Sequence, residues 1–436
     1  MAAGGSNNPS GDRPGARKAG GGRRPKGGPP GGRPTVRRLG HERGVKVAEL
    51  AARSLRAGHP WVFRDSMIRM VDGLEPGAAI RVLDADGGHI GWGLFEPEGA
   101  IAVRMFSRAP EATWDDDALS ERVTAAAAFR ASRLEPETQG ACRLIHAEAD
   151  GLPGLAVDRL GEYLLVYKYS RVVDSYIDRL IPVLERVFEP AGIYLQDRVR
   201  PVAAEERRPA ATHVAGKLAP PDIEVVEDGL RFLVDPSTPV SPGLFLDLRE
   251  GRRLLERMAR DRSVLNLFSF TGSFGLRAVR GGARSVTNVD AAPRSHARCR
   301  QNLEASGMDP EACEGLVGDV FKHLERLRRR DVRYDLVVVD PPPFSRVKGK
   351  VFSALRNWHE LIEAVVRVLA PDGEILAVSN ASKLSEDELM IALGQGAIAG
   401  GREARLVGEL GLPPDFPVPP AFAEGRYLDI KRLHVP

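Results

Sequence analysis

Between residues 266 and 273 the sequence runs Asn266-Leu267-Phe268-Ser269-Phe270-Thr271-Gly272-Ser273, from an apolar strand pattern into a turn. Gly272 permits a tight turn because glycine adopts left-handed backbone conformations at little steric cost, and Ser273 can cap the helix that follows. Ordinary strand-to-helix connections also use one glycine, and the segment lacks the three-glycine dinucleotide fingerprint. The turn therefore predicts a strand, a turn and a helix, and it leaves the ligand open.

The segments around this turn alternate between strand and helix patterns. The expected strands are residues 263–268, 285–289, 336–339 and 375–378, and the expected helices are residues 248–259, 273–280, 292–306 and 357–369. Such alternation predicts an α/β domain with a largely parallel, Rossmann-like sheet, whose ligands bind at the carboxyl ends of the strands. The chemistry is therefore expected just after these strands.

Acidic residues follow the expected strands. Asp290 stands where doubly wound folds bind the two hydroxyls of a ribose, and capping of the next helix is the alternative. Asp319 can accept a hydrogen bond from an adenine amino group, while Val320 can cover a ring face. In this order, the turn and the two acidic residues are more specific together than singly.

The strand at 336–339 ends in Asp340-Pro341-Pro342-Pro343-Phe344. The three prolines lack backbone donors and stiffen the chain, so that Asp340 faces the pocket, and Phe344 offers a ring for stacking. A proline-rich turn that merely closes a buried strand is the alternative. This segment is the strongest local signal for a site.

The chain of 436 residues is long enough for two or three domains. Short β-type runs with turn signals predict a small β-rich domain at residues 43–108. A helix at 115–134, strands at 154–158 and 163–167, and helical spacing at 172–188 predict a central α+β domain at 109–225, with a loop at 198–221. The doubly wound domain then covers residues 226–436.

Residues 1–42 form a basic tail in this division. The first 40 residues are crowded with glycine and proline and carry nine Lys/Arg against one acidic residue, Asp12. Such a composition buries too little apolar surface to fold, so we expect disorder. The formal net charge of +3 is due to this tail. A flexible cationic arm can neutralise phosphates of a nucleic acid, and a solubilising terminus is the alternative.

The cellular setting follows from composition. The cysteines Cys142, Cys299 and Cys313 are an odd set without paired spacing, which fits a reducing compartment and excludes a disulfide framework or a cysteine-rich zinc site. No apolar run approaches the ~20 residues that span a bilayer, and no signal-peptide core is present. We therefore expect a cytoplasmic protein without a metal centre.

The order of eight sequence motifs along the chain is informative. They include Gly243-Leu244-Phe245-Leu246-Asp247-Leu248-Arg249 and the segments 54–63, 147–155, 265–273, 289–290, 318–321, 340–344 and 424–428. Together they resemble the bacterial 23S rRNA large-subunit methyltransferases, and the resemblance covers essentially everything after residue 43. It implies a PUA-type RNA-binding domain first, a class I methyltransferase domain last, S-adenosylmethionine as the cofactor, and modification of a base in rRNA.

The resemblance also implies roles for single residues. The turn lies against the cofactor, Asp290 takes the ribose, Asp319 the adenine end and Asp340 the reacting centre, while Asp247 and Arg249 help to close the pocket. The positions implied for cofactor binding are Asp247, Arg249, Phe268, Thr271, Gly272, Asp290, Asp319 and Val320. The positions implied for catalysis are Asp340, Phe344 and Asn380.

The sequence departs from the family members that methylate carbon 5 of cytosine. Those members carry a cysteine nucleophile after the last of these strands, whereas this chain has Ser379-Asn380, and Cys299 and Cys313 lie elsewhere, on a helix and in a loop. The guanine N7 methyltransferases of the same rRNA have Ser-Asn here and Phe-Ser after the prolines. Nitrogen methylation is therefore favoured, with Asn380 at a base edge, and a turn-capping Asn380 is the alternative.

Two other functions stay open. The same fold can act on a small molecule or a protein, and a non-catalytic RNA-binding assembly factor can keep such a domain. The basic tail and the PUA-like domain argue against the first, and the intact acidic positions argue against the second. The expected partner is 23S rRNA or a large-subunit precursor, with no membrane, and a homodimer is left open. Trp61 can stack on RNA or belong to a core.

Overall fold

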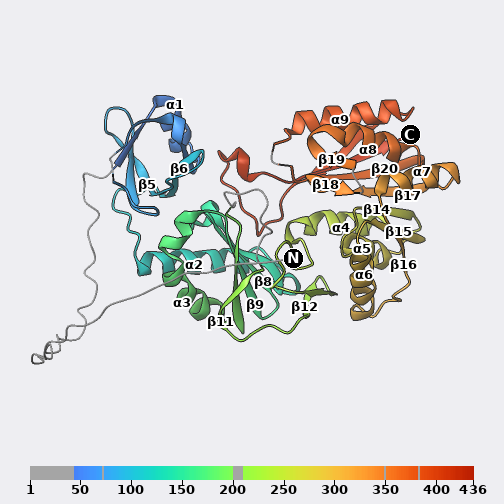
Figure 1. The fold of residues 1–436 in the computed structure, drawn as a ribbon, viewed down its shortest axis with the longest axis horizontal. Helices are drawn as coiled ribbons and strands as arrows, with labels where there is room; N and C mark the ends of the chain where they lie inside the picture. The colour runs from blue at the N-terminus through green and yellow to red at the C-terminus, as the bar shows by residue number, and fades with distance from the viewer. Residues whose placement is uncertain (1–43, 71–72, 200–209, 348–349, 382) are drawn as a thin grey trace, which may run out of the picture. The chain divides into compact units, whose positions relative to one another are not determined.

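The structure is a computed structural model that describes residues 44–70, 73–199, 210–347, 350–381 and 383–436. The basic tail predicted for residues 1–42 lies outside these ranges. Within them, no helix is long and apolar enough to cross a membrane. Three sheets organise the described chain, together with two hairpins (Figure 1).

The first sheet forms the small β-rich domain. Its six strands lie in the order β2-β6-β5-β4-β1-β3. They are β1 (Gly44–Val47), β2 (Trp61–Phe63), β3 (Met67–Met70), β4 (Ala79–Leu83), β5 (His89–Phe95) and β6 (Ile101–Ser107). The helix α1 (Glu49–Arg56) packs its buried Ala52 and Leu55 on the core that Ile80, Val82 and Val103 help to build.

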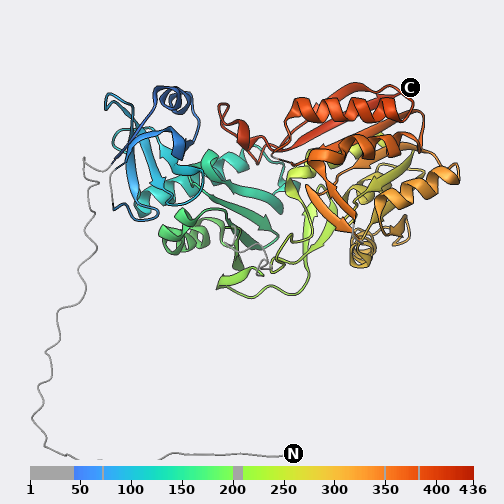
Figure 2. The same ribbon diagram turned by 45° about the horizontal axis from the view of Figure 1, so that its top comes forward.

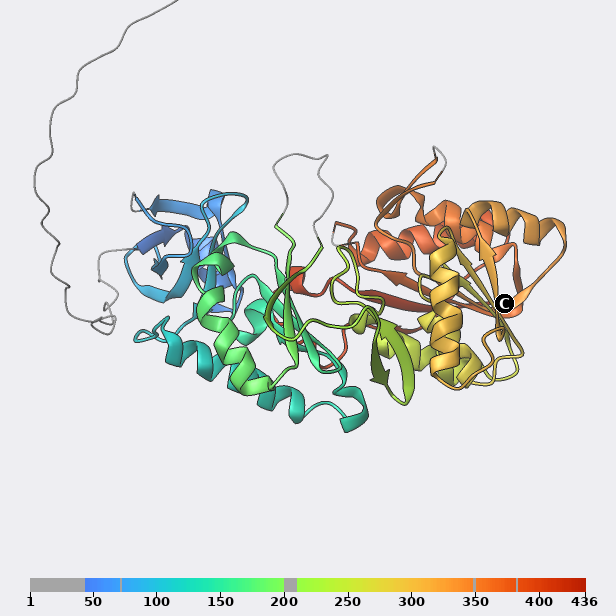
Figure 3. The ribbon, with the colours of Figure 1, turned by 60° about the horizontal axis from the view of Figure 1, so that its bottom comes forward.

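The central domain carries a five-stranded sheet in the order β11-β10-β9-β8-β7. Its strands are β7 (Ala141–His146), β8 (Leu155–Leu160), β9 (Tyr163–Lys168), β10 (Gly192–Asp197) and β11 (Thr212–Gly216). The helices α2 (Asp116–Ala131) and α3 (Ile177–Phe188) pack against each other beside it (Figure 3). The helix expected at residues 172–188 starts later, at Ile177, because the 3-10 turn Arg171–Ser175 precedes it.

The loop expected at residues 198–221 was wrong in part, because β11 lies inside it. This strand pairs antiparallel with β10, from Leu195↔Thr212 to Gly192↔Gly216. None of the five residues of β11 is buried, and a strand without a buried face has no need of alternating apolar residues. Backbone pairing at the sheet edge, rather than side-chain burial, makes it a strand.

The third sheet has seven strands in the order β16-β15-β14-β17-β20-β22-β21. They are β14 (Ser263–Leu267), β15 (Ser285–Asp290), β16 (Cys313–Val317), β17 (Tyr334–Val339), β20 (Leu369–Ser379), β21 (Arg405–Leu410) and β22 (Asp429–Val435). The first five are parallel, and β22 runs antiparallel to both of its neighbours. The parallel, doubly wound sheet predicted from the sequence is confirmed.

Helices cover both faces of this sheet (Figures 1 and 2). Alternate strand residues point to opposite faces, so Val264 packs in one core cluster while Leu265 and Leu267 pack in the other. On one face lie α4 (Arg249–Met258), α5 (Ser273–Arg280) and α6 (Pro293–Ala305). On the other lie α7 (Val320–Arg329), α8 (Ala354–Val366) and α9 (Glu386–Ala399).

Two hairpins complete the fold. The first, β12 (Ile223–Glu227) with β13 (Leu230–Val234), spans the boundary that we placed at residues 225/226. The second, β18 (Phe344–Val347) with β19 (Lys350–Ser353), follows the three prolines after β17.

A carboxylate from the long β21–β22 connection ties the central domain to the third sheet. Both oxygens of Asp415 contact the Arg249 guanidinium, at 2.8 and 3.2 Å, and the amide nitrogen of Arg143 donates to Oδ2 over 2.9 Å. The Asp415 carbonyl accepts from Arg130 at 3.0 Å, and Arg249 also donates to the Ala141 carbonyl at 2.7 Å. Asp415 and Arg249 are completely buried.

Replacing Asp415 with Ala tests this connection. The change leaves the buried Arg249 without its main partner, and breaking a buried ion pair in this way costs about 3–5 kcal/mol. We expect a lower midpoint of urea unfolding for Asp415→Ala, and no measurable change for Glu98→Ala at an exposed loop position. A midpoint like that of the unaltered protein would show that Asp415 does not hold the domains together.

Candidate active site

The turn after β14 has an unusual backbone. Phe268 and Phe270 have positive φ angles of 57° and 47°, and Gly272 has a φ of 79°. Residues other than glycine adopt such angles at a cost, and they persist only where the surroundings hold them. Here the Ser269 amide donates to the Val289 carbonyl at 3.0 Å, and the Thr271 hydroxyl donates to the Gly243 carbonyl at 2.7 Å. The turn is therefore fixed before any ligand binds.

Gly272 is required here for a second reason. A Cβ atom at this position would lie 2.3 Å from Sγ of Cys299 on α6, which is far inside contact distance. Gly272 is itself the N-cap of α5. Ser273 is the first residue of the helix, and no side-chain hydrogen bond caps the helix. The expectation that Ser273 caps this helix was wrong, because the left-handed glycine already occupies the cap position.

Asp290 holds the turn from the end of β15. Its Oδ2 accepts from the Phe270 amide and its Oδ1 from the Ala292 amide, each at 2.9 Å. The N-cap of α6 is Ala292, so Asp290 does not cap that helix. Each carboxylate oxygen keeps a second lone pair, which is the acceptor capacity that the hydroxyls of a ribose need.

Asp319 lies beside Asp290 at the end of β16. The Gly318 amide donates to the Asp290 carbonyl at 2.9 Å, which joins the two loops. Oδ1 of Asp319 accepts from the Lys322 amide at 3.0 Å, so Asp319 is the N-cap of α7. Val320 is only 5% exposed and packs in the core under the sheet. Little of its surface is left for the ring that we expected it to cover.

Asp340 directly follows β17, which pairs with β14 in the sheet. Burial, together with the charge of the nearby Asp247, raises the pKa of its carboxyl to about 7, while Arg252 opposes the shift. A carboxyl with this pKa exists in both protonation states near neutrality. Phe344 begins β18, and its side chain lies outside the described part of the chain, so its predicted stacking role stays a prediction.

Asp247 lies in a single 3-10 turn, Leu246–Leu248, directly before α4. Its Oδ2 accepts from the Tyr427 hydroxyl at 2.9 Å. The sequence marked Tyr427 as part of a motif without a role. This contact supplies one, because Tyr427 orients the carboxylate whose charge raises the pKa of Asp340. Sequence spacing could not predict this hydroxyl donor, because Tyr427 and Asp247 are 180 positions apart.

Arg249 is not where we expected it. Its side chain has no exposed surface, and besides Asp415 it lies 3.4 Å from a carboxylate oxygen of Glu227. The buried Glu227 also pairs with Arg252 and Arg277. Burial alone would raise the pKa of Glu227, but the three guanidinium groups lower it to about 2. Arg249 therefore supports the site from the interior and does not offer its charge to a ligand.

Asn380 follows β20, whose end lies beside that of β17 because Val339 pairs with Ala377. Its side chain is exposed, while Ser379 before it is buried. The three cysteines are buried and free in the described structure. Cys299 lies on α6, and Cys313 begins β16, where we had expected a loop. None of the three follows β17 or β20.

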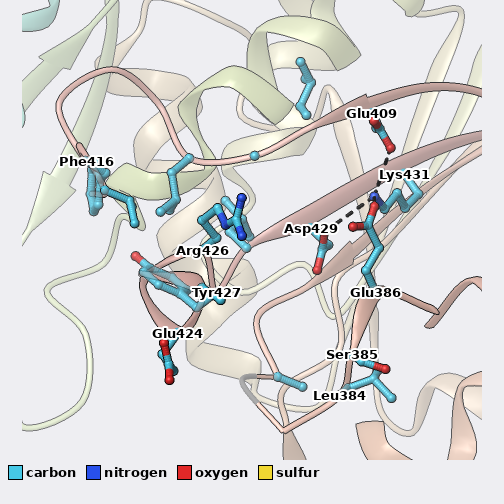
Figure 4. A pocket seen from close by; sticks show the side chains of 17 residues that line it. Leu384, Ser385, Glu386, Glu409, Phe416, Glu424, Arg426, Tyr427, Asp429 and Lys431 are labelled. Atoms are coloured by element: carbon cyan, nitrogen blue, oxygen red, sulfur yellow. Dashed lines mark hydrogen bonds and ion pairs between the residues drawn. The ribbon is translucent and has the colours of Figure 1, made fainter. Parts of the chain in front are cut away.

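A cavity of about 960 Å³ opens beyond Asn380 (Figure 4). Four carboxylates line it, from Glu386, Glu409, Glu424 and Asp429, against two cations, Arg426 and Lys431. The Lys431 ammonium already pairs with Glu386, Glu409 and Asp429. This acidic lining disfavours a phosphate.

The arrangement fits S-adenosylmethionine. The turn offers the backbone of residues 268–272, and the carboxylates of Asp290 and Asp319 offer acceptors for a ribose and an adenine. The Ser269 hydroxyl is buried and has no hydrogen-bond partner within the described residues, so the turn keeps a polar atom for a ligand. The sheet order with its reversed β22 and these loops define a class I S-adenosylmethionine-dependent methyltransferase.

Comparison with known proteins agrees. Residues 147–427 match the family model described as S-adenosylmethionine-dependent methyltransferase, and residues 45–108 match that of a PUA-like domain. Ribosomal RNA large subunit methyltransferase I of Klebsiella pneumoniae subsp. pneumoniae is 30% identical over 376 residues, 86% of this chain and 94% of the relative. The protein of the same name from Shewanella denitrificans is 31% identical over 386 residues, 88% and 97% of the two chains.

Solved structures share the fold. That of SMU.776 complexed with SAH has a TM-score of 0.81 and 24% identity, covering 90% of this chain and 100% of that one. A Streptococcus mutans protein has a TM-score of 0.79 and 23% identity, with the same coverage. The chain belongs to the family of ribosomal RNA large subunit methyltransferase I. It is an S-adenosylmethionine-dependent methyltransferase.

Gly272→Ala tests the role of the turn. The new Cβ meets Cys299 and a backbone strained by about 1–3 kcal/mol, so we expect the affinity for S-adenosylhomocysteine to fall about tenfold or more. Isothermal titration calorimetry measures this affinity. Gly401→Ala is the matched control, because its φ is 86° but a Cβ there meets nothing within 4 Å. Equal affinities for the two variants would contradict the assignment of the turn.

Proposed function

We propose that this enzyme methylates a base of large-subunit rRNA in the cytoplasm. The relatives are named for that substrate, and the PUA-like domain suits an RNA ligand. The three buried, free cysteines agree with a reducing compartment. The basic tail can add sequence-independent affinity for phosphates. A homodimer stays an untested alternative to a monomer.

We further infer that the methylated atom is a ring nitrogen, such as guanine N7, rather than carbon 5 of cytosine. The observation that carries this inference is the residue after β20, where Asn380 stands in place of a thiol nucleophile. Methylation of carbon 5 needs a thiolate beside the reacting carbon. Burial raises the pKa of the Cys142 thiol to about 12, so this thiol stays protonated near neutral pH. A ring nitrogen already has a lone pair and needs only positioning.

The residues of the chain then have simple tasks. The cofactor, when bound, supplies an electrophilic methyl group. In our proposal the turn and Asp290 hold its adenosine part, and the ionised Asp340 accepts hydrogen bonds from the amino or imino edge of the base. Tyr427 orients Asp247, whose charge raises the pKa of Asp340. Asn380 donates to or accepts from another edge of the base.

The pH dependence tests the role of Asp340. Because its raised pKa lies near 7, the carboxylate form is lost as the pH falls below that value. We expect kcat/KM for rRNA to rise with pH through about 7 when rRNA and S-adenosylmethionine are both below saturation.

Asp340→Asn should remove this limb of the pH profile and lower kcat/KM about 10- to 100-fold, as expected for the loss of a charge-assisted hydrogen bond. Its affinity for S-adenosylhomocysteine should persist. Asp372→Asn, at a side chain that is 82% exposed, is the control and should keep the profile. A variant with unchanged turnover would remove Asp340 from the reaction.

The substrate and the atom are tested by transfer of labelled methyl groups to rRNA from a strain without this protein. Nucleoside mass spectrometry should find a methylated guanine. A product of 5-methylcytosine would contradict the assignment of Asn380. If S-adenosylmethionine binds but neither naked rRNA nor ribosomal subunits gain a methyl group, the substrate is not rRNA, and a role in assembly or on another molecule takes its place.

A further inference from the structure

A second cavity lies between the central domain and the methyltransferase domain. Its volume is about 450 Å³. The strands β7, β8 and β9 form one side, and the segment from Val240 to Asp247 forms the other. None of Asp290, Asp319 and the turn at 268–272 lines it, and of the positions implied for cofactor binding only Asp247 does.

Apolar side chains stand exposed around this cavity. Tyr169 is 48% exposed, Phe245 is 43% exposed and Val240 is 66% exposed, and all three line it. The Tyr169 ring stacks on that of Tyr167 at 6.0 Å with an interplanar angle of 21°. Exposed aromatic rings gathered at one concave site are typical of a binding surface, and a flat aromatic ligand suits them.

The inner wall adds polar groups that are held in place. The Arg143 guanidinium lies 4.4 Å from the centre of the Phe416 ring and pairs with the buried Asp158. It also contacts Nδ1 of His146 at 3.0 Å. Burial and the neighbouring Arg143 lower the pKa of His146, so the imidazole is neutral. Since Arg143 donates to Nδ1, the proton of His146 is on Nε2, where it is a hydrogen-bond donor.

The cavity adjoins the reacting centre. Asp247 lines it, receives the Tyr427 hydrogen bond and raises the pKa of Asp340 through its charge. Phe245, two residues earlier, lies 5.4 Å from the Phe270 ring of the cofactor turn, measured between centroids. One short segment thus borders both this cavity and the cofactor turn.

We propose that this cavity binds the target nucleotide after it leaves the RNA helix, with its base against the rings of Tyr169 and Phe245. The inference rests on the proposed rRNA substrate and assigns its target base to this cavity. A base within a helix must be flipped out before a methyl group can reach it, and aromatic rings replace the stacking that it loses. The larger cavity beyond Asn380 is less suitable, because its acidic lining repels phosphates.

The test compares Tyr169→Ala with Tyr169→Phe in the full-length enzyme. Loss of the ring should lower kcat/KM for rRNA about 10- to 100-fold, as for the removal of one stacking partner of a base. The affinity for S-adenosylhomocysteine should not change. Tyr169→Phe keeps the ring and should retain most of the activity. Ile398→Ala, at a 69% exposed position on α9, is the control for loss of exposed apolar surface.

Ultraviolet crosslinking of rRNA to the unaltered enzyme gives a second readout that does not need turnover. We expect crosslinked peptides to contain Tyr169 or Phe245. Crosslinks confined to the lining of the acidic cavity, or full activity of Tyr169→Ala on rRNA, would overturn the proposal and leave the proposed function intact. If rRNA is not methylated but Tyr169→Ala still weakens nucleotide crosslinking, the rRNA function fails and the pocket stands.

Discussion

The buried ion pair between Asp415 and Arg249 is the constraint on which the arrangement of the domains depends. A charge without water needs a partner, and here the partner comes from a loop 166 residues further along the chain. The same carboxylate accepts from the backbone of β7, so the central sheet and α4 share one anchor. Glu227 extends the network through Arg252 and Arg277.

This network also positions the site. The β21–β22 connection that carries Asp415 carries Phe416 as well, which packs on Arg143, and it ends near Tyr427, which orients Asp247. One loop therefore sets the wall of the cavity between the domains and the electrostatic surroundings of Asp340. Binding of a base and activation of the carboxylate are expected to depend on the same loop, although it contributes no residue to the cofactor turn.

The sequence predicted the doubly wound sheet well, because buried parallel strands such as β17 are continuous apolar runs. It also placed Asp290 and Asp340 at strand ends, since these ends follow from the alternation of strand and helix patterns. It failed for β11, whose residues are not buried, and for Arg249, whose partner Asp415 is remote in sequence. The spacing of residues predicts local secondary structure. Whether a charged side chain is buried depends on segments that are distant in sequence and meet only in the folded chain.

The long sequence separation between Arg249 and Asp415 has a consequence for biosynthesis. During translation, Arg249 leaves the ribosome 166 residues before Asp415, the carboxylate that binds it through two hydrogen bonds. Until Asp415 follows, the guanidinium of Arg249 lacks this partner, which disfavours its burial between the two domains. The contact that joins the two domains therefore forms only after residue 415 has been made, and a product truncated before that residue lacks it.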